Sequence, residues 1–124
     1  MKKILLLLLI LFYSISSKTQ IIFEFDTIEF NSEYKNEKKE IYGKIIIDSD
    51  TNKIVTEYNG IMFNDIISKL LFTSNHNTRV IEYCYSLNEK ELLHIFKYND
   101  KIYSIVISST VNHKNYTIYT KKYL

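Results

Sequence analysis

Two apolar runs on either side of a short polar turn form the most regular pattern in the chain. Residues 92–97 (LLHIFK) and 102–109 (IYSIVISS) are separated by a turn that contains Asn99 and Asp100. Asn and Asp tolerate the left-handed backbone of a tight hairpin, so these two residues predict a two-residue loop. With the loop there, one largely apolar face carries three cross-strand pairs: Leu92 with Ile107, His94 with Ile105, and Phe96 with Tyr103.

A second hairpin is predicted for residues 41–59, where apolar and polar residues alternate around a loop at 49–52 (SDTN). The register that this loop predicts pairs apolar residues with each other and a basic residue with an acidic one. It also lays an aromatic ring over a glycine, whose bare backbone the ring can cover. The expected pairs are Ile47 with Ile54, Ile45 with Thr56, Lys44 with Glu57, and Gly43 with Tyr58.

Strand-like alternation recurs in three further segments. Residues 21–30 alternate, but the apolar phase shifts across Asp26-Thr27, which predicts a β-bulge. Residues 79–87 and 116–120 are each expected to form one strand, whereas the charged segment 31–40 has no period and is expected to be an exposed loop. In 79–87 the apolar face is formed by Ile81, Tyr83, Tyr85 and Leu87.

The hydrophobic period changes after Gly60. Apolar residues then recur at the spacing of one helical face, and polar residues take the opposite face. Burial of the apolar face outweighs the small helix-propensity penalty of its branched side chains, so an amphipathic helix over residues 62–72 is expected to pack on the sheet. A short apolar run is also compatible with a strand, so both readings stay open. The apolar residues are Phe63, Ile66, Ile67, Leu70 and Leu71.

These segments together predict a mainly β (α+β) fold. We expect a curved antiparallel sheet of about seven strands with one amphipathic helix packed on it, in the order β-β-β-α-β-β-β-β. The 124-residue chain has no Pro, two Gly and no repeat, so no linker divides it. Residues 17–124 are therefore expected to form a single small mainly-β domain.

The first residues have the pattern of an export signal. A basic start at Lys2 and Lys3 precedes nine apolar residues, 4–12, and small residues follow at Ser14 and Ser16. Residues 1–16 are therefore predicted to be a secretory signal peptide, cleaved between 16 and 20. The run is short for a transmembrane helix, although an uncleaved anchor and a buried core helix are alternatives. The mature protein is expected to be secreted, or periplasmic at the cell envelope, without a membrane span.

The charge of the chain excludes one class of partner. The whole chain has 16 basic and 14 acidic residues, and removal of Lys2 and Lys3 with the signal peptide leaves the two numbers equal. A neutral domain gives no electrostatic reason to bind nucleic acid. The expected partners are therefore a protein or a small apolar ligand, and the oligomeric state stays open.

Known catalytic and metal-binding patterns are missing from the sequence. His76, His94, His113 and Cys84 show no spacing typical of metal ligands, and no cofactor is expected. Residues 48–52 resemble the first half of a calcium loop, but the second half lacks its glycine and its glutamate. Cys84, the single cysteine, is expected to be a small buried residue, and no catalytic residue is assigned.

Tyrosine is the abundant residue type that suits recognition, because its ring is apolar and its hydroxyl polar. Eleven Tyr occur in the chain, most of them expected in the core and on the sheet. The leading hypothesis is a non-catalytic exported binding or interaction module; the alternatives are a small exported hydrolase with an unrecognised site and a calyx-like carrier of a small apolar ligand. The candidate binding residues are Tyr83, Tyr85, Tyr103, Tyr119 and His94.

Overall fold

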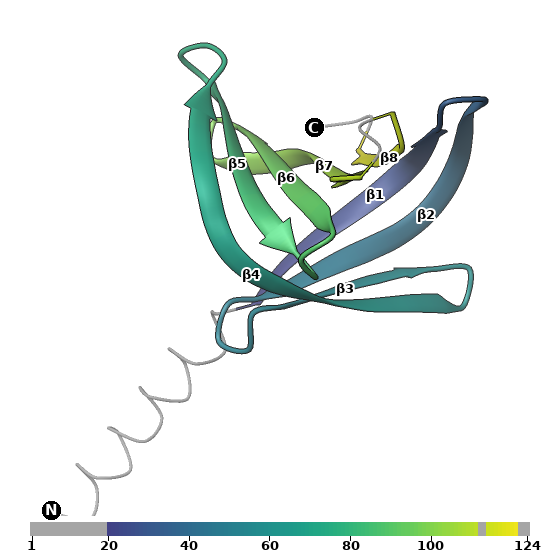
Figure 1. Ribbon diagram of the computed structural model, residues 1–124, viewed down its shortest axis with the longest axis horizontal. Helices are drawn as coiled ribbons and strands as arrows, with labels where there is room; N and C mark the ends of the chain where they lie inside the picture. The colour runs from purple at the N-terminus through teal and green to yellow at the C-terminus, as the bar shows by residue number, and fades with distance from the viewer. Residues whose placement is uncertain (1–19, 112–113, 122–124) are drawn as a thin grey trace, which may run out of the picture.

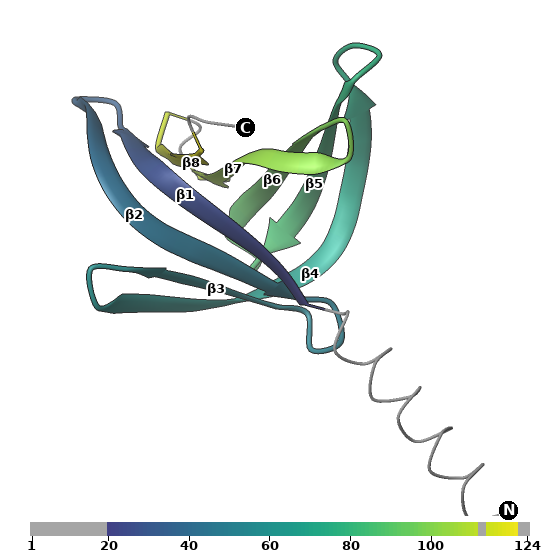
Figure 2. The same cartoon turned by 180° about the vertical axis from the view of Figure 1, so that it is seen from behind.

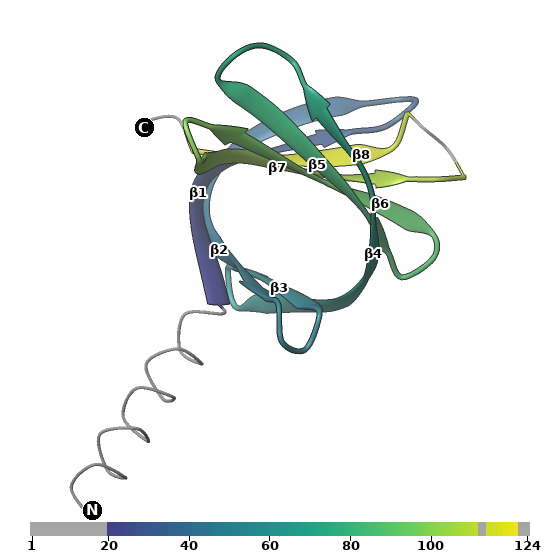
Figure 3. The same ribbon diagram turned by 90° about the vertical axis from the view of Figure 1, so that its left-hand side faces the viewer.

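Eight antiparallel strands close into a barrel in the computed structural model, which describes residues 20–111 and 114–121. Each strand pairs with its neighbour in the sequence, and the last pairs with the first, so the sheet has no open edge (Figure 1, Figure 3). The strands are β1 (Gln20–Asn31), β2 (Asn36–Asp48), β3 (Lys53–Tyr58), β4 (Ile61–Asn75), β5 (Val80–Leu87), β6 (Glu91–Tyr98), β7 (Lys101–Ser109) and β8 (Tyr116–Thr120).

The mainly β antiparallel class is confirmed, whereas the helix over residues 62–72 and the curved sheet of about seven strands are wrong. That segment lies within β4, which pairs with both β3 and β5. Register shifts follow Ile67 and Leu70, and each one inserts a residue that breaks the two-residue alternation. Phe63, Ile67 and Leu70 thus share the inner face at intervals of four and three residues, which is the spacing of a helical face.

The hairpin of residues 41–59 is confirmed in every predicted pair, from Gly43 opposite Tyr58 to Ile47 opposite Ile54. The β-bulge at Asp26 is also confirmed, since the register between β1 and β2 shifts between Phe25 and Thr27. Gly43 is needed for packing as well as for the hairpin, because a Cβ there would clash with the backbone carbonyl oxygen of Glu57 and with the ring of Phe25. Close approach of a ring to the backbone explains the glycine.

The hairpin of residues 92–109 is confirmed in its two paired strands and its turn, but its register holds only next to the turn, as far as Lys97 opposite Ile102. Asn99 and Asp100 both have positive φ, 49° and 65°, as a tight two-residue turn requires. A register shift between Phe96 and Lys97 moves every pair farther from the turn by one residue, so that His94 faces Val106. The predicted apolar face is consequently wrong: Leu93, Ile95, Ile105 and Ile107 turn inward, whereas Leu92, His94, Phe96 and Tyr103 lie on the outer wall.

The expected loop over residues 31–40 is shorter than predicted. β2 begins at Asn36, and four residues, 32–35, connect it to β1. Residues 36–40 of β2 are largely exposed on both faces, so they carry no apolar alternation that sequence reasoning could detect. This turn of the β1–β2 hairpin projects at one edge of the molecule (Figure 1, Figure 2).

The barrel interior is filled across its middle by apolar side chains. Every strand except β4 contributes at least one fully or almost fully buried member, and β4 adds the partly buried Ile67. The apolar residues of β4 are instead about half exposed, Leu70 to 51% and Phe63 to 46%. The buried members are Phe23, Phe25, Ile28, Ile45, Ile47, Ile54, Leu87, Leu93, Ile95, Ile105 and Tyr119.

The predicted signal peptide, residues 1–16, and its cleavage region up to residue 19 lie outside the described residues. Export and cleavage therefore stay predictions. Within the part of the chain that the structure describes, we find no helix with the length and apolar character needed to span a bilayer.

Candidate functional site

A cavity of about 670 Å³ lies at the end of the barrel that contains the β1–β2 turn. This end cavity lies beyond the packed middle of the barrel, and Tyr119 forms part of both. Exposed Ser32 and Lys35 stand at its rim. Its aromatic walls come from strands far apart in sequence, and they consist of Phe30, Tyr58, Phe63, Tyr116 and Tyr119.

Two carboxylates, Asp65 of β4 and Glu91 of β6, share the end cavity with these rings. Burial raises the pKa of Glu91, and the nearby charge of Asp65 raises it further. Burial also raises the pKa of Tyr119, with smaller contributions from Tyr58, Asp65 and Glu91. Asp65, Glu91 and Tyr119 therefore interact electrostatically inside the end cavity, whose lining is acidic as well as aromatic.

Hydrogen bonds hold one of these carboxylates in place. Asn88, in the β5–β6 turn, donates through Nδ2 to Asp65 Oδ1 at 2.5 Å and accepts through Oδ1 from the Ile66 N–H at 2.9 Å. The positive φ of Asn88, 49°, is a conformation that asparagine adopts more readily than most residues. The turn thus fixes Asp65 from outside while the carboxylate lines the end cavity.

A buried amide in the end cavity has no partner. Asn31, the last residue of β1, is 9% exposed and lines the end cavity. Its side-chain Nδ2 has no hydrogen-bond partner among the described residues. An unpaired buried donor costs about 1–3 kcal/mol, so this group needs an acceptor that the described residues do not supply.

A smaller cavity of about 250 Å³ lies at the opposite end, beside the β2–β3 loop. Tyr83 and Tyr85 of β5 line it together with apolar residues that include Ile95 and Ile102. Lys97 also lines it, with its Nζ 5.2 Å from the centre of the Tyr83 ring. The position of the ammonium group indicates a cation–π contact.

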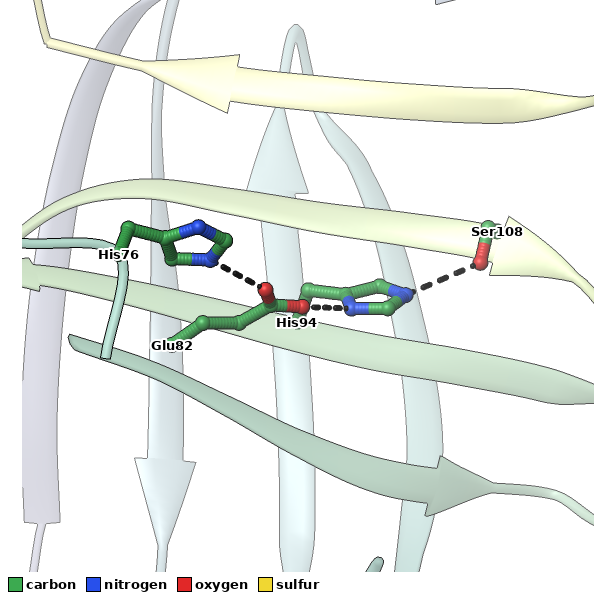
Figure 4. A network of polar contacts seen from close by, with 4 residues as sticks. All are labelled: His76, Glu82, His94 and Ser108. Atoms are coloured by element: carbon green, nitrogen blue, oxygen red, sulfur yellow. Dashed lines mark hydrogen bonds and ion pairs between the residues drawn. The ribbon is translucent and has the colours of Figure 1, made fainter. Parts of the chain in front are cut away.

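A polar network occupies the outer wall across β5, β6 and β7. Glu82 accepts hydrogen bonds from His76 Nε2 at 2.7 Å and from His94 Nδ1 at 2.6 Å (Figure 4). A carboxylate can only accept, so the proton of His94 is on Nδ1, and a neutral His94 accepts through Nε2 from the Ser108 hydroxyl at 3.3 Å. We call His76, Glu82, His94 and Ser108 the outer-wall network.

Glu82 is the most shielded ionisable member of the outer-wall network, with its side chain 11% exposed. Burial alone would raise the pKa of Glu82, but the hydrogen bonds of His76 and His94 outweigh it and lower the pKa below its usual value. Cys84, two residues along the same strand, is fully buried as expected, and burial followed by the charge of Glu82 raises its pKa. A thiol in this setting is a poor nucleophile.

The five predicted site residues lie in three separate places. Tyr83 and Tyr85 line the small cavity, and Tyr119 lines the end cavity. Tyr103 lies on the outer wall, where its ring centre is 6.2 Å from that of Phe96, and His94 belongs to the outer-wall network. No single site brings these five residues together.

Apart from His94, the polar residues of the end cavity and of the outer-wall network were not predicted from the sequence. Asp65 falls in the segment expected to be a helix, and the expected fold does not include the barrel that brings Asp65 and Glu91 into one cavity. The clearest missed signal concerns His76 and Glu82, which flank the polar segment 77–79: a hairpin there places the two side chains close together. Among the described residues no group of three or more His, Cys, Asp or Glu is arranged to hold a metal ion, and His113 lies outside them.

Comparison with protein-family models, curated proteins and solved structures finds no match to this chain, so the function has to be argued from the barrel itself.

Proposed function

We propose that the mature chain is an exported, non-catalytic binding protein that holds a small amphipathic molecule in the end cavity. The observation that carries this proposal is the end cavity itself, about 670 Å³ of space with aromatic walls at the end of a closed barrel. Small-molecule sites typically measure about 300–1,000 Å³ and combine apolar walls with a few polar groups. The end cavity has this size and this composition.

The packed middle of the barrel explains why the ligand would occupy one end. Buried apolar side chains fill the barrel between its two ends. Tyr119 is one of them, only 6% exposed, and it forms the floor of the end cavity. The rings of Phe25 and Tyr119 lie 5.0 Å apart, and those of Tyr58 and Phe63 lie 6.0 Å apart. A ligand in the end cavity would extend these aromatic contacts.

Fluorescence titration with N-phenyl-1-naphthylamine, a neutral apolar probe, tests the proposal. Phe63 lines the end cavity, whereas its neighbour Met62 lies on the other face of β4 and does not. Phe63→Ala is expected to weaken probe binding about fivefold or more, because a large apolar wall is removed. Met62→Ala, at a residue of similar exposure, serves as the matched control and should leave the affinity unchanged.

Failure of the folded wild-type protein to bind the probe, or equal effects of Phe63→Ala and Met62→Ala, would contradict a binding function of the end cavity. Export is tested separately by the intact mass of protein recovered from the medium or the cell envelope. A chain shortened by 16 to 20 residues is expected.

The outer-wall network favours a second candidate function, hydrolysis with Ser108 as nucleophile. Ser108, His94 and Glu82 follow one another in the order of a nucleophile, a base and an orienting acid. A hydrolase also needs N–H donors near the nucleophile to stabilise the oxyanion. The two backbone N–H groups that follow Ser108 are already used, because the Ser109 N–H donates to the Asn115 carbonyl and the Thr110 N–H to the Lys90 carbonyl. This pairing makes hydrolysis the weaker candidate.

Turnover of p-nitrophenyl acetate separates the two candidates. A hydrolase would lose its activity in Ser108→Ala and His94→Ala while these variants remain folded. The binding proposal predicts that wild type and Ser108→Ala hydrolyse the ester at the same background rate.

A further inference from the structure

The end cavity contains two acidic groups, Asp65 and Glu91, whose charges no basic side chain among the described residues balances. Among the described residues no basic side chain forms an ion pair with Asp65 or Glu91. The other acid in the cavity, Glu37, is balanced by Lys35 at 3.9 Å and Lys39 at 3.2 Å. The remaining charge of the end cavity is therefore negative, and a cation would relieve the repulsion between Asp65 and Glu91.

The aromatic walls indicate what kind of cation fits. Tyr119 lies close enough to Asp65 and Glu91 for their charges to raise its pKa, and the rings of Tyr58 and Phe63 lie 6.0 Å apart in the same cavity. Aromatic faces attract ammonium groups, and the attraction increases where water is excluded. Rings and carboxylates around one space are suited to an organic ammonium ion with an apolar body.

The unpaired Nδ2 of Asn31 is the second, independent observation. Asn31 is nine-tenths buried and lines the same cavity, and its amide finds no acceptor within residues 20–111 and 114–121. A bare metal ion would not satisfy it, because an N–H donor cannot coordinate a cation. Two carboxylates are also few for a hard cation such as Ca²⁺, which takes about six to eight oxygen ligands. The donor points instead to an organic ligand that brings its own oxygen acceptor.

We propose that the end cavity binds a small organic amine in its ammonium form, with an apolar or aromatic body and a hydroxyl or carbonyl oxygen. The ammonium group lies between Asp65 and Glu91, the body contacts the aromatic walls, and the oxygen accepts from Asn31 Nδ2. This inference rests on the proposed function and deepens it, since it names the chemical class of the ligand.

Three probes with one scaffold test the charge preference by isothermal titration calorimetry at pH 7. Tyramine has an ammonium group, 4-ethylphenol is the neutral counterpart, and 3-(4-hydroxyphenyl)propionate is the anion. Tyramine is expected to bind about tenfold or more tightly than 4-ethylphenol, as a charge-assisted hydrogen bond provides, and the anion should bind weakest.

Variants then assign the preference to the named residues. Glu91→Gln and Asp65→Asn should each weaken tyramine binding about tenfold while the affinity for 4-ethylphenol stays the same. Glu29→Gln, at an acidic residue of β1 that does not line the end cavity, is the matched control and should change neither. Asn31→Ala should weaken both phenols, because both have the hydroxyl that Asn31 would bind. Urea unfolding of each variant verifies that the barrel is intact.

Several results would overturn the amine assignment and leave the proposed function standing. They are equal or tighter binding of the anion, tyramine binding that Glu91→Gln does not change, or failure of all three probes while N-phenyl-1-naphthylamine binds. Displacement of tyramine by stoichiometric CaCl₂ would likewise replace the amine by a metal ion. Failure of N-phenyl-1-naphthylamine as well would contradict both the inference and the proposed function.

Discussion

Glu82→Gln is the substitution that tests the outer-wall network most sharply. Glutamine keeps the shape of the side chain, so it leaves no cavity, but it removes the charge and replaces one acceptor oxygen by a donor. Two histidines bond to Glu82 at 2.6 and 2.7 Å, and at least one of them then loses its acceptor. Because the Glu82 side chain is only 11% exposed, water cannot fully replace the lost partner.

The magnitude follows from one lost charge-assisted hydrogen bond. Such a bond contributes about 1.5–3 kcal/mol, so Glu82→Gln should lower the free energy of unfolding by that amount at pH 7. Glu57→Gln is the matched control. It removes an outer-wall ion pair to Lys44 at 3.5 Å whose partners are 32% and 47% exposed, and such a pair is worth at most about 1 kcal/mol.

The pH dependence has a definite sign. The pKa of Glu82 is lower in the folded protein than its usual value of 4.5, so its stabilising contribution is complete above that value. The contribution is lost as the pH falls through the lower folded pKa. The difference between wild type and Glu82→Gln should therefore be largest near pH 7 and should shrink in acid.

Urea unfolding followed by far-UV circular dichroism, at a series of pH values from 7 to 3, measures these differences. A loss below about 0.5 kcal/mol at pH 7, the range of ordinary surface substitutions, would refute the account of the network. So would a difference that does not change between neutral and acidic pH.

Three further predictions concern the barrel and are each checked by urea unfolding. Gly43→Ala should destabilise by about 1–3 kcal/mol, because the new Cβ meets the Glu57 carbonyl oxygen and the Phe25 ring; an unchanged midpoint would contradict this close packing. Leu93→Ala, in the core, should cost about 2–5 kcal/mol, whereas Leu70→Ala, half exposed, should cost less than 1; equal costs would contradict the difference in burial between the two leucines. Glu91→Gln should stabilise the folded protein at pH 7 and lose that advantage near pH 4. Burial and then the charge of Asp65 raise the pKa of Glu91, so its ionised form opposes folding as the pH rises. A variant less stable than wild type at pH 7 would contradict this direction of the pKa shift.

Local patterns were sufficient for most strands and turns of this protein. The turn at Asn99-Asp100 and the hairpin of residues 41–59 depend on residues close in sequence, and both are confirmed. The bulge at Asp26 was visible because it shifts the apolar phase within one strand. Each of these features leaves its trace in a window of a few residues.

The wrong predictions concern segments in which a bulge changes the spacing of apolar residues and the sequence shows no sign of the bulge. Two bulges in β4 produce a helical spacing of apolar residues, and one bulge after Phe96 exchanges the two faces of a hairpin. Barrel closure could not be predicted from local patterns either, because it depends on pairing between β1 and β8, which are far apart in sequence. The end cavity depends on that closure, and so Asn31, Asp65 and Glu91 could not be grouped from sequence.

The central claim is that the end cavity is the ligand site, and NMR mapping tests it most directly. Amide shifts of ¹⁵N-labelled mature protein are recorded while N-phenyl-1-naphthylamine is added. We predict that the shifts gather at residues lining the end cavity, such as Asn31, Tyr58, Phe63 and Glu91. Shifts gathered at Tyr83 and Tyr85 of the small cavity, or no shifts at all, would contradict the account.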